Sequence, residues 1–561
     1  MNRRLVLLGL ALGVLTTLLL ALGHRDVGYA RDEGIYFAAS RHYGAWFGDL
    51  TREPGKALTQ TGRDRRFRIN HEHPALLKSA AGISAALLAR APAAGTSDEE
   101  LVDTGGVLPI MDEGAAMRLP AQLMTGVTVA LLFVAAARWG TLFAGLLAAG
   151  AFILLPHVQF HAGLHAFDVP VAMAILAVVL AYRRSQHSRR WGLALGVVLG
   201  VAIAVKHNAL FLGPLLALHH WGALALARWR DGRTVSRSQW VSLPLVSMAT
   251  LGPLTAIGLW PWLWSDTAAR IGEYFTFHRQ HAYYNTEFFG QNFNQPPMPV
   301  SYPFVMTWAT VPTVLLALAL LGAAIALRAD WARARPEVGT GSFWTPLPAS
   351  WTRHDGLLFA IMASFPLVLI ALPSTPIFGG TKHWITAYPF MALLAARAWT
   401  VLWQNVRAPR WWQPVALGMV LLPGAISTID GHPFGMSQYA PLVGGARGAA
   451  DLGLARGFWG HAIATRLPTL GETLGHRKRL YVHDVHDLAV LQYRREGRWP
   501  ENTESVPIAR AQAGLLFHEL HMATWEYQLW EQLGTAAPID VVTIDGVPLV
   551  SIYAVPDHRR Q

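Results

Sequence analysis

Long apolar runs recur along the first 430 residues of the chain, separated by short polar segments. Each run approaches the roughly 20 residues that a helix needs to cross a bilayer, so the pattern predicts about eleven transmembrane helices. The predicted spans are residues 5–23, 119–137, 141–156, 168–182, 191–205, 209–227, 241–260, 304–327, 357–373, 384–402 and 413–429.

After residue 430 the apolar runs shorten, and the pattern becomes that of a small α/β domain. The segments "RLYVHD" and "AGLLFHE" are typical of strands, and "IDVVTIDGVPLVSIYAV" is typical of a hairpin that turns at Asp545-Gly546. Between them, "ATWEYQLWEQL" is typical of a helix. We therefore expect a transmembrane domain over residues 1–429 and an extracytoplasmic domain over residues 430–561. Within the first, the loop 24–118 is expected to add interfacial helices, one near residues 75–90.

Composition agrees with a polytopic membrane protein. Of the 561 residues, 52% are hydrophobic and only 14% are charged, against about a quarter charged in soluble domains. The net charge of +11 would suggest nucleic-acid binding in a soluble protein, but arginines in short cytoplasmic loops account for it here. We expect no nucleic-acid partner. The chain has no cysteine, which excludes disulfides, thiol catalysis and cysteine-ligated metals.

The distribution of basic residues predicts the orientation in the membrane. Arginines such as Arg183 and Arg184 follow the even-numbered spans, whereas the short loops on the other side hold few basic residues. The positive-inside rule then places the N-terminus in the cytoplasm and the C-terminal domain outside the cell inner (plasma) membrane. The segment 5–23 could instead be a cleaved signal peptide. In both cases Asp32 lies outside.

Polar side chains gather in five segments on this predicted outer side. An ionisable group at the end of a span costs about 2.5 kcal/mol or more if it stays in lipid, so such groups tend to line a cavity. Their convergence predicts an active site for a substrate delivered from the lipid phase. The candidate residues are Asp32, Glu33, His73, Lys78, Asp168, Lys206, His207, Lys382 and His383.

The same segments resemble the membrane-embedded glycosyltransferases of the C-type fold, in the branch with the protein O-mannosyltransferases and the lipid A aminoarabinose transferases. That branch has an acidic pair after the first transmembrane helix, as in "RDEGIYF" with Asp32 and Glu33. Its first external loop has a histidine-proline segment that ends in a lysine, as in "HPALLK" with His73 and Lys78.

The resemblance continues in order along about residues 1–430. A second aspartate closely followed by proline opens the fourth span, as in "FDVP" with Asp168. Lys206 matches a lysine around the fifth and sixth spans, and Lys382 matches a basic residue before a "YP" helix. One departure is Ala166, where the family has a basic residue, and this puts a donor contact there in doubt.

The resemblance implies transfer of a sugar from a polyprenyl phosphate to a protein, lipid or polysaccharide, with no metal or other cofactor. Such a reaction needs a base for the acceptor's proton and cations for the leaving phosphate. Asp32 is the candidate base, with Glu33 beside it, and direct attack inverts the anomeric configuration. Lys78, Lys206 and Lys382 would neutralise the phosphate, with donors from His207 and His383. Asp168 would orient sugar hydroxyls or hold a lysine.

Other interpretations stay open. Asp32 and Glu33 would also suit the first turn of the next helix, where acids are stabilising, and Lys206 would also suit snorkelling to the interface. The i, i+4, i+8 spacing of His157, His161 and His165 could serve zinc, although Pro156 and Gly163 interrupt the helix. The alternative function is a transporter or flippase of a lipid-linked substrate, in which the polar cluster binds but does not react.

Overall fold

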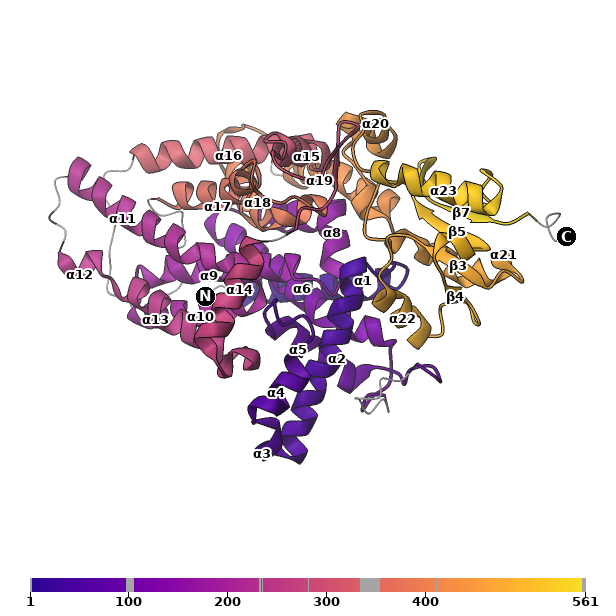
Figure 1. The fold of residues 1–561 in the computed structure, drawn as a ribbon. Helices are drawn as coiled ribbons and strands as arrows, with labels where there is room; N and C mark the ends of the chain where they lie inside the picture. Colours follow the sequence, from indigo (N-terminus) through magenta and orange to yellow (C-terminus); the bar gives the residue numbers. More distant parts are fainter. Residues whose placement is uncertain are drawn as a thin grey trace.

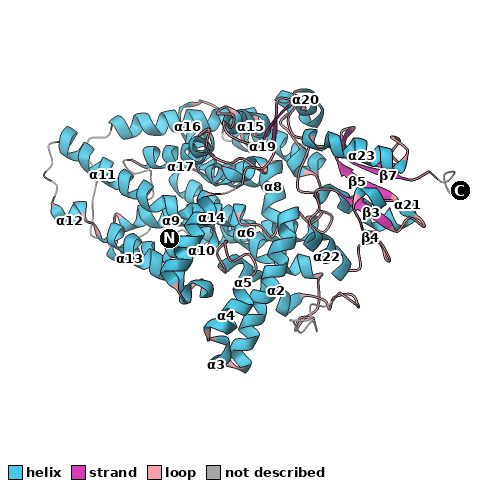
Figure 2. Cartoon of the chain, in the orientation of Figure 1, coloured by secondary structure: helices cyan, strands magenta, loops and turns pink. Residues whose placement is uncertain are grey.

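The computed structural model describes residues 3–96, 105–231, 234, 236–280, 282–332, 354–409 and 411–556. Helices dominate these residues, and the larger sheet lies at the C-terminal end of the molecule (Figure 2). A second, two-stranded sheet pairs β1 (Thr286–Phe288) with β2 (Gln291–Phe293).

Seven helical segments of the described chain are long and apolar enough to cross a membrane, and the bent pair α7 (Leu142–Ile153) and α8 (Pro156–Gly163) would make eight. The chain therefore has the helices of a multi-pass membrane protein. The seven segments are Arg3–Gly23 (α1), Glu113–Trp139 (α6), His207–Leu226 (η1 and α11), Arg237–Gly258 (α12 and α13), Thr313–Trp331 (α16), Ile385–Asn405 (η4 and α18) and Trp412–Gly431 (α19).

The remaining predicted spans are also helical, but they are short or charged. Helices α10 (Arg189–Val205) and α17 (Asp355–Ile370) have 17 and 16 residues. Helix α9 (Asp168–Ser185) has charged residues at both ends. The predicted span 304–327 includes most of α16 (Thr313–Ala332), one of the seven segments, and is broken between α15 (Tyr302–Thr310) and α16. The predicted helical fold class of this part is confirmed, apart from the short strands β1 and β2, and the count of eleven spans stays a prediction.

Small residues let the first helix approach its neighbour closely. A Cβ atom added at Gly13 of α1 would lie 2.6 Å from the carbonyl oxygen of Gly126 in α6. Such close backbone approach is typical of packing between membrane helices, where small residues replace a hydrophobic driving force. The contact packs the middle of α1 against α6.

The C-terminal part forms a five-stranded sheet in the order β4-β3-β5-β7-β6 (Figure 1). Strand β3 (Arg479–Val482) pairs in parallel with β4 (Glu504–Ser505) and β5 (Ala513–Phe517), whereas β7 (Val547–Ala554) is antiparallel to β5 and β6 (Asp540–Ile544). The predicted strands, the hairpin at Asp545-Gly546 and the helix, now α23 (Ala523–Leu533), are confirmed.

This sheet domain packs directly on α2 (Arg31–Arg52), the helix that begins beside Asp32. Its helix α22 (Asp487–Arg495) is so close that a Cβ atom at Gly34 would lie 2.4 Å from the backbone nitrogen of Ala489. The Tyr29 hydroxyl donates to Glu496 Oε1 at 2.7 Å. The helix predicted near residues 75–90 is present as α5 (Leu76–Leu88), packed against α2, and its interfacial position stays a prediction. Helix α2 is therefore held by α22 at Gly34, near its start, and by α5 at Gly44, near its middle.

Candidate active site

One cavity of about 830 Å³ brings together all five segments that the sequence singles out. It is lined by the start of α2, the loop before α5, the start of α9, η1 (His207–Phe211) and η3 (Gly380–His383). Residues of the sheet domain complete its wall, among them Asp484 and Glu519. Of the nine candidate residues, eight line this cavity: Asp32, Glu33, His73, Asp168, Lys206, His207, Lys382 and His383.

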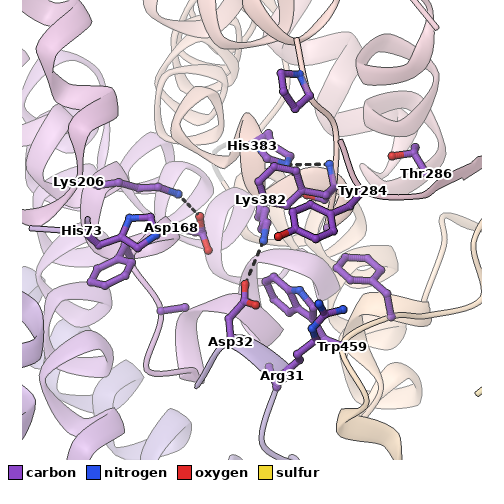
Figure 3. Close-up of a pocket in the computed structure, with 18 of the residues that line it drawn as sticks. Arg31, Asp32, His73, Asp168, Lys206, Tyr284, Thr286, Lys382, His383 and Trp459 are labelled. Atoms are coloured by element: carbon purple, nitrogen blue, oxygen red, sulfur yellow. Dashed lines mark hydrogen bonds and ion pairs between the residues drawn. The ribbon is translucent and has the colours of Figure 1, made fainter. Parts of the chain in front are cut away.

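Asp32 and Lys382 face each other across this cavity (Figure 3). The Lys382 Nζ atom lies 3.5 Å from Asp32 Oδ2, and the lysine side chain is 6% exposed while that of Asp32 is 33% exposed. Burial lowers the pKa of Lys382, and Asp32 opposes that shift. The pair combines an accessible carboxylate with a sheltered cation.

A second pair of the same kind lies at the start of α9. Lys206 Nζ is 2.6 Å from Asp168 Oδ1, and both side chains are largely buried. Lys206 follows the last residue of α10, so its side chain reaches across from one helix end to another. Of the two roles that the sequence suggests for Asp168, this contact matches the one in which the carboxylate holds a lysine.

Glu33 has a different environment from Asp32. Its side chain is 1% exposed, and Arg118 donates to both carboxylate oxygens, at 2.8 and 2.7 Å. The carboxylate also accepts the backbone N–H groups of Ala30 and His165. Because four donors of the protein occupy this carboxylate, we infer a positioning role in place of the expected catalytic one. Glu33 anchors the first turn of α2. This is the helix-stabilising role that the sequence offered as an alternative to catalysis.

Lys78 is buried and is not among the described residues that line the cavity. Its ammonium group donates to the carbonyl oxygens of Asn70 and His73 and to the hydroxyl of Tyr43. The expected contact of Lys78 with a phosphate therefore needs correction, because its donors are used within the loop 70–73. The lysine holds that loop against the cavity.

The histidines divide into two groups. His383 contacts the backbone of Phe378 and so shapes the turn before Lys382. His73 and His207, with His278 of α14 (Thr267–Arg279), have ligand nitrogens within 4.8 Å of one another. Burial lowers the pKa of His73 well below its ordinary value, which keeps the imidazole neutral. These three rings could hold a metal ion; the expectation that no metal takes part stays a prediction.

The three histidines at helical spacing are not brought together. His157 contacts the Thr381 hydroxyl at 3.0 Å and the Gln438 carbonyl at 2.9 Å. His165 lies beyond the end of α8 and contacts the Ser40 hydroxyl at 2.8 Å. His161 packs edge-on against Trp459. The prediction of a possible zinc site at these three positions is therefore wrong for the described residues, because the helix ends before His165.

Sequence reasoning missed several residues of the site. Arg118 is a buried arginine directly before the second predicted span. Its position beside an apolar run was the one sequence feature that could have marked it as a site residue. The Lys382 ammonium lies over the Trp459 ring, 4.0 Å from the ring centroid. Arg31 and Tyr284 line the same cavity (Figure 3). No local motif marks Trp459 or Tyr284.

The arrangement can bind an anion and accept a proton within one cavity. Lys206 and Lys382 supply two cations in a low-dielectric setting, where a charge-assisted hydrogen bond is stronger than in water. Of the two carboxylates that pair with these lysines, that of Asp32 is more exposed than that of Asp168. A leaving phosphate and an attacking hydroxyl are both accommodated by this set of groups.

Comparison with known proteins agrees with the motifs. Residues 106–255 match the family model described as dolichyl-phosphate-mannose-protein mannosyltransferase. The chain is similar in structure to ArnT from Cupriavidus metallidurans in the apo state, with 16% identity, 98% of each chain covered and a TM-score of 0.48. For the ArnT structure bound to undecaprenyl phosphate the values are 15%, 98% and 0.44. No curated protein matches. The predicted resemblance to this mannosyltransferase family is confirmed over residues 106–255.

Proposed function

We propose that this chain is an integral-membrane, inverting glycosyltransferase that moves a sugar from a polyprenyl phosphate to an acceptor hydroxyl on the extracytoplasmic face. The observation that carries the proposal is the presence of two lysine–carboxylate pairs, Lys382 with Asp32 and Lys206 with Asp168, in one cavity. The match to a family that uses dolichyl-phosphate mannose supports a donor of this chemical class.

In the proposed reaction Asp32 takes the proton of the acceptor hydroxyl while the hydroxyl oxygen forms a bond to the anomeric carbon of the donor sugar. The bond between that carbon and the phosphate oxygen breaks, and its electron pair leaves with the polyprenyl phosphate. The phosphate gains one negative charge, which Lys206 and Lys382 stabilise. One displacement inverts the anomeric configuration.

Apolar side chains at one side of the cavity suit the lipid part of such a donor. Leu210 and Phe211 of η1 and Phe275 and Phe277 of α14 line the cavity, and each is more than a third exposed. Exposed apolar residues beside polar groups mark a contact with lipid or ligand. A prenyl chain along these residues would bring its phosphate toward Lys206.

The second candidate is a transporter or flippase of a lipid-linked substrate. The bent pair α7–α8, with an angle of 71°, is the feature that favours it, because broken helices are common in transporters. In that case the lysines would bind the phosphate, but the bond to the sugar would stay intact.

Release of free undecaprenyl phosphate separates the two candidates. The purified protein in lipid nanodiscs is incubated with a panel of undecaprenyl-phosphate sugars, with and without cell-envelope extract as the acceptor source. Transfer predicts release that requires the protein and rises with the extract. Binding of the panel without release under either condition would overturn the glycosyltransferase and favour transport.

A further inference from the structure

The sheet domain places a pair of carboxyl groups, Asp484 and Glu519, in the wall of the active-site cavity. The Asp484 side chain is 8% exposed, and that of Glu519 is 13% exposed. Asp484 Oδ2 and Glu519 Oε1 are buried and accept no hydrogen bond from any other group of the described residues, so the two carboxyl groups are each other's partners. Buried polar atoms without a donor are uncommon in proteins and often belong to a binding site.

The surroundings of the pair keep its charge low. Burial raises the pKa of both carboxyl groups, and their mutual contact raises that of Glu519 further. Glu287 lies beside them with its pKa also raised by burial. Arg31 is the cation that faces the pair, and Arg456 acts on Glu287. Two adjacent buried carboxyl groups share a proton, so one O–H group lies between them and their remaining oxygens can accept hydrogen bonds from a ligand.

Backbone geometry also distinguishes this place. Asp484 has φ 59° and Trp459 has φ 73°, in the left-handed region that residues other than glycine seldom adopt. Arg31 joins the pair to the reaction centre, because its Nη1 donates to Asp484 Oδ1 at 3.3 Å and its backbone N–H donates to Trp459. Arg31 immediately precedes Asp32, so the pair is tied to the candidate base.

Asp484 stands between the cavity and a second pocket of about 370 Å³, whereas Glu519 lines the cavity alone of these two. Four residues line both spaces: Arg31, Asp484, His486 and His521. The apolar residues of η1 and α14 belong to the part of the chain before residue 430, whereas the second pocket is lined by Arg31 and by residues 483–487, 521 and 522 of the sheet domain. A lipid-linked donor and a water-borne acceptor would therefore reach Asp32 from different sides.

We propose that Asp484 and Glu519 form the acceptor subsite, and that the acceptor presents a neutral sugar residue with adjacent hydroxyl groups. This inference rests on the proposed transferase function. Two neighbouring carboxyl groups match adjacent hydroxyls, each of which donates and accepts, whereas a serine or threonine side chain has only one. The ring of Tyr284, 44% exposed and next to Arg31, offers an apolar face for the C–H groups of a sugar.

The test uses neutral disaccharides as probes: mannobiose, chitobiose and maltose. Their binding to the full chain in nanodiscs, loaded with undecaprenyl phosphate, is measured by saturation-transfer NMR for the wild type, Glu519→Gln and Asp484→Asn. The matched control is Glu531→Gln, an exposed glutamate of α23 in the same domain. We expect at least one probe to bind the wild type and the control, and its Kd to rise tenfold or more in both cavity variants.

Affinity for undecaprenyl phosphate is measured in parallel and should stay within about twofold in all variants, which also shows that they fold. A wild type that binds no disaccharide, or cavity variants that bind it normally, would overturn the subsite. So would binding of a serine- and threonine-containing hexapeptide in place of the sugars, or a matching loss of phosphate affinity. If the wild type releases no sugar from any donor, the transferase function fails, whether or not the disaccharides bind.

Discussion

The ammonium group of Lys382 lies 3.5 Å from the carboxylate of Asp32, although 350 residues separate them in the chain. The contact joins the first turn of α2 to the short helix η3. Because the lysine is buried and the aspartate is partly exposed, the lysine is a fixed cation and the aspartate is the group that a substrate meets.

Replacing Lys382 by methionine should weaken phosphate binding. The substitution keeps much of the side-chain volume but removes the cation, and a hydrogen bond to a charged group contributes about 1.5–3 kcal/mol. We expect the Kd for undecaprenyl phosphate to rise about tenfold to 100-fold, as measured by quenching of tryptophan fluorescence. Lys56→Met is the control, since the Lys56 side chain is 82% exposed. An unchanged Kd in Lys382→Met would remove this lysine from the donor site.

The contact between Lys206 and Asp168 should appear as an interaction energy. If Asp168 acts by holding Lys206, then Asp168→Asn and Lys206→Met should each slow sugar release, and the double variant should be little slower than Lys206→Met. Residues in direct contact show coupling of about 0.5–3 kcal/mol in such cycles. Release rates of the four proteins, measured at saturating donor, give this value. Additive effects would mean that Asp168 acts separately, on the sugar.

Glu33→Gln should affect stability before it affects chemistry. The exchange removes the charge that faces buried Arg118, and leaving one member of a buried pair uncompensated costs about 3–5 kcal/mol. We expect a lower midpoint of thermal unfolding than in the wild type, followed by circular dichroism in nanodiscs. Asp32→Asn should keep the midpoint nearly unchanged. A Glu33→Gln protein that melts normally but releases no sugar would restore Glu33 as a catalytic group.

Lys78→Met should likewise act through the structure. The exchange removes the donor to the carbonyl oxygens of Asn70 and His73, and each acceptor left unsatisfied costs about 1–3 kcal/mol. The unfolding midpoint should fall, while the Kd for undecaprenyl phosphate should change much less than in Lys382→Met. Equal losses of phosphate affinity in the two variants would show that Lys78 contacts the donor after all.

Local patterns in the sequence predicted the elements of this protein well. The turn at Asp545-Gly546 and the helix Ala523–Leu533 follow from local propensity, which needs no knowledge of the rest of the chain. The number of spans is harder to predict, because α9 combines an apolar centre with Asp168, Arg183 and Arg184, and length and composition alone do not decide such a case.

The candidate site was predictable only where ionisable residues stand out beside apolar spans, as Asp32, Asp168 and Lys382 do. The residues that contact them could not be predicted from the sequence. Glu33 and Arg118 look equally unusual in the sequence, yet their mutual contact depends on how α2 and α6 pack, across 85 residues. Asp484 meets Arg31 across 453 residues, and no local motif marks it. Long-range packing decides which acids are free and which are neutralised.

The most direct test of the proposed mechanism is the rate of undecaprenyl phosphate release by Asp32→Asn, beside the wild type and an Asp451→Asn control. Asp451 is an exposed aspartate at the end of α20 (Gly445–Asp451). A positioned general base contributes about 10²–10⁴-fold. We predict a loss of release in that range, with donor affinity within about threefold of the wild type. Release at the wild-type rate by Asp32→Asn would contradict the role of Asp32 as the base.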